Sequence, residues 1–161
     1  MKTSEYNEFL NNLSAPLLRY AFNFLKNQDE AKDIVQDVFE KLWLNRDKVD
    51  VDKVKAWLFR CAYHAMINYT RKQTRMCKFS SEVHDRSNDE RFEFESKQVI
   101  DQIVSSLPPI QKSIILLRDL EGYHYSEIGE ILSLNPSQVK VYLFRARLKI
   151  KKQLIQLKEV L

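Results

Sequence analysis

Two stretches of the sequence carry many basic side chains and no acidic one. Residues 53–79 hold seven lysines and arginines, and residues 136–152 hold six. Lysine and arginine neutralise phosphates, so two separate basic segments favour a partner with regularly spaced negative charge, which is nucleic acid. The alternative is a pair of solvated helix surfaces, the usual fate of a run of charge. The net charge of the whole chain, +4, conceals this uneven distribution.

A third stretch has the opposite sign. Residues 27–52 contain eight acidic residues against four basic ones. Four polar side chains within it recur at intervals of three and four and therefore share one face of a helix. This acidic face consists of Asp33, Gln36, Asp37 and Glu40. The apolar residues between them predict that the opposite face is buried, which leaves the acidic face either solvated or free to bind a basic partner.

Residues 125–147 have the pattern of a helix-turn-helix. Gly129 is small where two helices must approach closely, and Val139 is the expected buried residue of the second helix. The first residues of that second helix would enter a major groove. The predicted DNA-contacting residues are Ser137, Gln138, Lys140, Val141, Tyr142, Phe144, Arg145 and Arg147. An ordinary helical hairpin is the structural alternative.

Catalysis has no candidate residues in this sequence. Gly122 and Gly129 are its two glycines, which excludes a P-loop and a GxGxxG site. No Ser/His/Asp set and no pair of carboxylates is placed to converge on a pocket. We therefore expect a protein that is not an enzyme and that has no cofactor and no small-molecule substrate.

The histidines and cysteines do not predict a metal site. The spacing of Cys61, His64, Cys77 and His84 fits no tight zinc site, so we expect no metal and interpret Cys61 as a small buried residue. Two cysteines make no disulfide framework. No signal peptide and no apolar run of roughly 18 residues is present, which predicts a soluble, cytoplasmic protein that does not insert into a membrane.

The elements that position these residues are predicted to be helices. The low glycine and proline content argues against a β-sandwich or barrel. Pro16 allows either one kinked helix over residues 4–26 or two shorter ones, with Ser14 capping the second. The further helices are expected at 29–44, 53–72, 94–107, 109–121, 125–132 and from 136 to the C-terminus. Trp43 and Trp57 are expected in the core.

The chain is predicted to divide into two small helical domains. Residues 76–97 are polar and lack helical periodicity, which indicates a flexible linker. The domains would cover residues 1–75 and 98–161. Each is small, so each is expected to be only marginally stable alone.

Several segments resemble one family of proteins. Residues 107–118, 121–132 and 139–147 are similar to region 4 of extracytoplasmic function sigma factors, the specificity subunits of bacterial RNA polymerase. Residues 33–43 and 56–60 resemble region 2 of the same family. The two blocks occur in the family's order, which implies a region 2 bundle joined to a region 4 helix-turn-helix.

The resemblance implies roles for these surfaces. The acidic face would bind core RNA polymerase. The predicted DNA-contacting residues of the helix-turn-helix, Ser137 to Arg147 as given above and named the −35 set from here on, would bind the −35 element of promoter DNA. The helix over 53–72 would contact the −10 element, and residues 45–52 would form a pocket for a flipped base. An anti-sigma factor is implied as an inhibitory partner. The implied −10 set is Arg60, Tyr63, His64, Ile67, Asn68 and Arg71.

The sequence departs from the family pattern in three places. His64 stands where the family often carries Asn, and His124 stands where a capping Ser is common. Val141 and Tyr142 replace a common Ser-Arg pair, and Val141 can touch a thymine methyl group without hydrogen bonding. These changes imply altered promoter preferences. Two other classes stay open on the sequence: a dimeric helix-turn-helix regulator that works without polymerase, and a helical adaptor without a nucleic-acid partner.

Overall fold

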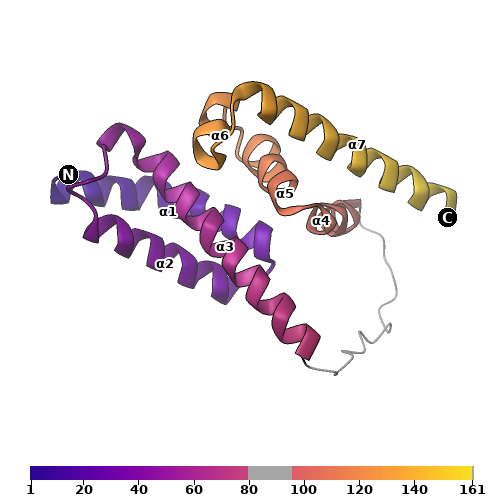
Figure 1. Cartoon of the computed structure of the whole chain (residues 1–161), viewed down its shortest axis with the longest axis horizontal. Helices are drawn as coiled ribbons and strands as arrows, with labels where there is room; N and C mark the ends of the chain where they lie inside the picture. Colours follow the sequence, from indigo (N-terminus) through magenta and orange to yellow (C-terminus); the bar gives the residue numbers. More distant parts are fainter. Residues whose placement is uncertain (80–95, 161) are drawn as a thin grey trace.

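The computed structural model describes residues 1–79 and 96–160, and every regular element in these ranges is helical (Figure 1). The prediction of an all-α protein is therefore confirmed. The elements are α1 (Thr3–Leu25), α2 (Gln28–Leu44), the 3-10 turn η1 (Val51–Lys53), α3 (Val54–Phe79), α4 (Ser96–Ser106), α5 (Pro109–Ile115), the π-helical turn η2 (Leu116–Leu120), α6 (Tyr125–Leu132) and α7 (Pro136–Val160).

Helices α1, α2 and α3 form the first bundle. Helix α1 runs through Pro16 as one helix, and the Ser14 hydroxyl donates to the Leu10 carbonyl instead of capping a second helix. The alternative of two shorter helices is therefore wrong. Asn27 caps α2, since its side-chain oxygen accepts a hydrogen bond from the Glu30 amide at 3.0 Å.

The third helix is longer than its periodicity predicted. Helix α3 continues beyond Lys72 to Phe79 and so includes the first residues of the predicted linker. Residues 80–95 of that linker lie outside the described residues. The domain limits at 75 and 98 stay predictions.

Helices α4 to α7 form the second bundle, with α7 along its outer edge in Figure 1. Gly122 has a φ of 74° and ends the helical run that starts at Pro109, as predicted. His124 precedes α6 and makes no side-chain cap, in line with its poor capping chemistry. Asn135 and Gln138 cap α7 reciprocally, because each side-chain oxygen accepts from the other's backbone amide, at 2.8 and 2.9 Å.

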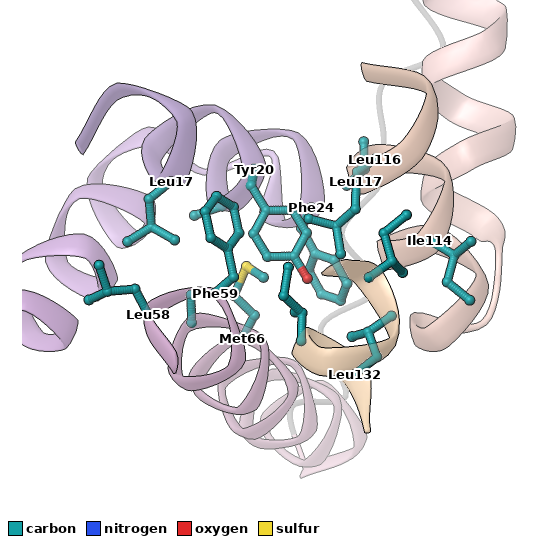
Figure 2. Close-up of a cluster of buried hydrophobic side chains, with 14 of the residues drawn as sticks. Leu17, Tyr20, Phe24, Leu58, Phe59, Met66, Ile114, Leu116, Leu117 and Leu132 are labelled. Atoms are coloured by element: carbon teal, nitrogen blue, oxygen red, sulfur yellow. The ribbon is translucent and has the colours of Figure 1, made fainter. Parts of the chain in front are cut away.

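The two bundles share one hydrophobic core (Figure 2). Tyr20 of α1 is fully buried, and its hydroxyl lies 2.9 Å from that of Ser113 in α5. Phe59 of α3 meets the ring of Tyr123 edge-on at 5.4 Å. Each bundle alone has room for only a small core, and this contact buries further apolar side chains of both. The sequence left the arrangement of the two halves open, and the structure packs them together.

Candidate polymerase and nucleic-acid interfaces

The acidic face lies on the solvent side of α2. Asp33, Gln36, Asp37 and Glu40 are all exposed, whereas Ile34, Val38 and Phe39 of the same helix are buried. Among the described residues none of the three carboxylates forms an ion pair. Their charge is therefore available to an external cationic partner.

An apolar groove runs beside the acidic face, between α1 and α2. Its volume is about 760 Å³, and Gln36 and Glu40 stand on its edge. Trp43, expected in the core, is half-buried and lines this groove, with its ring 5.0 Å from that of Tyr6. The Arg46 guanidinium lies 4.2 Å from the centre of the Trp43 ring. The acidic face thus continues into an apolar surface.

The −10 set lies along one length of α3 but differs in exposure. His64, Asn68 and Arg71 are exposed, so the predicted shared face of His64 and Asn68 is open to solvent. Tyr63 and Ile67 are half-buried, and burial raises the pKa of the Tyr63 hydroxyl. Tyr63, Ile67 and Arg71 line a crevice of about 540 Å³ that α5 closes on its other side.

Arg60, the remaining member of the −10 set, is bound to the second bundle. Its Nη2 donates to the backbone carbonyl of Glu130 in α6. Its Nε is buried and has no hydrogen-bond partner within the described part of the chain. The side chain expected to contact DNA is therefore held by the second bundle of the same chain.

A second cation on α3 is held in the same way. Lys55 Nζ lies 3.3 Å from a carboxylate oxygen of Glu127 and 3.8 Å from the centre of the Tyr123 ring. No motif in the sequence assigned a role to any of these three residues. The signal was present, because α3 is basic and α6 carries Glu127 and Glu130 one turn apart, but nothing in the sequence placed the two helices side by side.

The loop after α2 forms a pocket against α3. The pocket measures about 470 Å³ and is lined by Asn45, Lys48, Val49, Asp50, Lys53, Ala56, Trp57, Arg60 and Glu130. Trp57, predicted to be core, packs against the core with one side and is half-buried in this wall. Glu130 comes from α6, so the second bundle contributes to a pocket otherwise built by the first.

The second helix of the helix-turn-helix presents the −35 set to solvent. Of that set Tyr142 is half-buried and the other seven residues are exposed, Phe144 by 68%. Val139 is fully buried as predicted. A Cβ on Gly129 would collide with the Leu134 carbonyl oxygen, which confirms the need for a small residue there.

Two members of the −35 set already have partners inside the chain. Gln138 belongs to the cap of α7. Arg147 Nη2 lies 2.6 Å from a carboxylate oxygen of Asp119, and the hydrogen bond to this carboxylate raises the pKa of Arg147. Lys140 and Arg145 are exposed and form no ion pair among the residues that the structure describes, so both are available to phosphates.

In the described ranges no three His, Cys, Asp or Glu side chains are grouped as metal ligands would be. The side chain of Cys77 and the whole of His84 are not among the parts that the structure describes. Cys61 was expected to be fully buried, but it is only half-buried. This partial burial raises the pKa of its thiol. A search of the described helices found none with the length and apolarity that a membrane crossing requires.

Comparisons with known proteins place both halves of the chain in one family. Residues 10–76 match the family model of sigma-70 region 2, and residues 97–150 match that of sigma-70 region 4. RNA polymerase sigma factor SigV of Bacillus subtilis is 30% identical, over 80% of this chain and 78% of the relative. ECF RNA polymerase sigma factor SigM of the same species is 28% identical, over 83% of this chain and 85% of the relative.

A solved structure shares the fold. The sigma factor RpoE of Bartonella quintana, solved in complex with the anti-sigma factor NepR, matches with a TM-score of 0.75 at 23% identity, over 94% of this chain and 98% of that one. The fold, the order of the two regions and these sequence relatives agree. The chain belongs to the extracytoplasmic function family of RNA polymerase sigma factors, which bind core RNA polymerase and direct promoter-specific transcription initiation.

Proposed function

We propose that three charged surfaces of this sigma factor divide its work. The acidic face of α2 binds a basic surface of core polymerase, α3 and the loop pocket bind the −10 element as a separated strand, and α7 binds the −35 element as duplex. The observation that carries this proposal is the presence of three exposed charged surfaces on three different helices, one acidic and two basic. Opposite charges suit a protein partner and a DNA partner respectively.

The residue roles follow from position and chemistry. The exposed carboxylates of Asp33 and Asp37 would attract cations of the polymerase, and the groove beside them would take apolar side chains. On α3, His64 and Asn68 would contact bases while Arg60 and Arg71 would contact phosphates. On α7, Val141 would touch a thymine methyl group, and Lys140 and Arg145 would contact the backbone.

The chain acts in this proposal as a binding protein without catalysis of its own and without a cofactor. It would work in the cytoplasm, where polymerase and promoters are. An anti-sigma factor is its expected inhibitor, by analogy with the complexes of structurally similar sigma factors.

The polymerase-binding surface is tested by reversing its charge. Asp33→Lys with Asp37→Lys is expected to lower promoter-dependent transcription by core polymerase more than about 100-fold, because like charges would then face each other across the interface. The measurement is in vitro transcription over genomic fragments, with start sites mapped. The control, Glu8→Lys with Glu159→Lys, changes the charge by the same amount at exposed sites elsewhere. Equal loss in both proteins would contradict the role of the acidic face.

The DNA-binding surface of α7 is tested separately. Lys140→Ala with Arg145→Ala is expected to weaken binding to −35 duplex about tenfold and to lower the salt dependence by about two counterions. Fluorescence anisotropy across a salt series measures both quantities. Lys158→Ala, at the far end of the same helix, is the control. If the natural chain has no specific affinity for the duplex, so that the double change alters nothing, the adaptor class is favoured. DNA binding without any affinity for core polymerase would favour the dimeric regulator.

A further inference from the structure

We propose that the C-terminal end of α6 occupies the −10 site of α3 in the free chain, in place of the DNA strand. The free protein would then offer α7 to duplex DNA while Arg60 and the loop pocket stay engaged with region 4. This inference rests on the proposed role of α3 in −10 binding.

The contact of Arg60 uses an acceptor that the end of a helix leaves open. The last carbonyls of a helix have no intrahelical partner. In α6 the amides of Ser133 and Leu134 both donate to the Gly129 carbonyl, so the next carbonyl, that of Glu130, is left for Arg60. The negative pole of the helix lies at the same end and attracts a cation. This end of α6 resembles a phosphate in its chemistry, because it offers Arg60 an oxygen acceptor in a region of negative potential.

A carboxylate completes the likeness to a DNA backbone. Glu127 lies one turn before Glu130 on α6 and pairs with Lys55, which lies five residues before Arg60 on α3. Two acceptors on one helix thus meet two cations on the other. Glu130 also borders the loop pocket that would receive a base. Region 4 therefore covers Arg60 and one wall of the loop pocket, whereas His64, Asn68 and Arg71 stay exposed.

The fit is incomplete in a way that favours exchange. Arg60 Nε is buried without a partner among the described residues, and a buried unpaired donor is unfavourable. A phosphate can accept from two guanidinium nitrogens at once, as the single Glu130 carbonyl does not here. The DNA strand would therefore satisfy Arg60 better than α6 does. Opening is opposed by the shared core around Tyr20, Phe59 and Tyr123, so −10 binding must first separate the bundles.

The experiment reverses the charge of Glu127, the carboxylate of α6 that pairs with Lys55. Glu127→Lys sets two lysines against each other and is compared with Glu159→Lys, which makes the same change at an exposed site on α7. The first readout is the radius of gyration from small-angle X-ray scattering. The second is the anisotropy of a labelled single strand carrying the −10 sequence of a promoter mapped by transcription.

Glu127→Lys is expected to raise the radius of gyration and to tighten single-strand binding about fivefold relative to Glu159→Lys, with equal affinity for −35 duplex. Circular dichroism confirms that both variants fold. Lys55→Glu combined with Glu127→Lys restores an ion pair and should restore the compact scattering curve. Tyr123→Ala, which removes the ring against Phe59, should act in the same direction as Glu127→Lys.

Equal scattering and equal strand binding in Glu127→Lys and Glu159→Lys would overturn the inference, as would a natural chain that is already extended. Failure of the proposed role of α3 looks different: the strand then binds to none of the proteins, although the scattering curves of Glu127→Lys and Glu159→Lys can still differ. The scattering comparison decides whether region 4 holds α3 in either case.

Discussion

The two basic helices, α3 and α7, carry similar charge in the sequence but meet different surroundings in the fold. Helix α3 packs against α1 and α2 and also against α6 of the second bundle, so Lys55 and Arg60 are bound to α6. Helix α7 packs through one narrow face around Val139 and Leu143 and leaves Lys140 and Arg145 free of ion pairs within the described ranges. The number of basic residues therefore indicates how many side chains could bind DNA, whereas packing determines which of those side chains are available.

The contrast extends to how each helix is held in position. The start of α7 is fixed by the local turn, through the Asn135–Gln138 cap and the tight approach at Gly129. The availability of the basic side chains of α3 depends on contacts with residues far away in the sequence, such as Glu127 and Glu130. Substitutions in this turn should therefore weaken DNA binding by α7. Substitutions at the contact between α3 and α6 should change how far the basic side chains of α3 are exposed.

The largest expected effect is a loss of stability at the turn that positions α7. Gly129→Ala should lower the free energy of unfolding by about 2–3 kcal/mol, because its Cβ collides with the Leu134 carbonyl. The gain in helix propensity, about 1 kcal/mol, is too small to compensate. Urea unfolding and −35 duplex binding measure the outcome. Ser126→Ala, exposed on the same helix, should change stability by less than about 0.5 kcal/mol. A stable Gly129→Ala protein with full duplex binding would contradict this account of the turn.

The next effect concerns the cover over α3. Ser113→Ala leaves the fully buried Tyr20 hydroxyl without its 2.9 Å partner and should destabilise the chain by about 1–2 kcal/mol. Adding Tyr20→Phe removes the unpaired group, so the double variant should be more stable than the sum of the single changes predicts. A double-mutant cycle by urea unfolding tests this coupling. Additive changes would show that the hydrogen bond does not join the bundles.

The smallest effect is a pH dependence that sharpens the same comparison. Burial, followed by the carboxylates of Glu121 and Glu127, raises the pKa of Tyr123 from 10.0 to about 12. A raised folded-state pKa means that the stabilisation is complete below pH 10 and is lost as the pH rises toward 12. The slope from one proton is at most about 1.4 kcal/mol per pH unit, and less here because the ring is only half-buried.

Tyr123→Phe is the matched variant for this pH dependence. It keeps the ring against Phe59 and removes the titrating group. Its stability should fall less steeply than that of the natural chain between pH 10 and 12, as followed by urea unfolding at a series of pH values. Identical slopes in the two proteins would show that Tyr123 titrates normally.

Much of this protein was predictable because its determinants are local. The periodicity of α2 predicted both the buried residues Ile34 and Val38 and the exposed acidic face, since residues three and four apart share a helix face. Gly122, Gly129 and the Asn27 cap marked ends and close approaches that depend on a few neighbouring residues. The family motifs are short runs of the same local kind, and their presence in both halves sufficed to identify a sigma factor.

Other predictions failed where the burial or the role of a side chain depends on residues distant in the sequence. Trp43, Trp57 and Cys61 have the composition of core residues, yet each is half-buried, because burial depends on which surface a neighbouring element covers. The roles of Lys55, Tyr123 and Glu127 were missed for the same reason. Their sequence context gives no sign that α3 and α6 lie together.

The sequence by itself determined the helices, their buried faces, the signs of their exposed charges and the family to which the chain belongs. These depend on residue spacing within single helices and turns. Only the tertiary structure decided that the two bundles share a core and that Arg60 is bound to the end of α6. Such contacts join residues about 70 positions apart, and their free energy comes from surfaces that exist only once both bundles have folded.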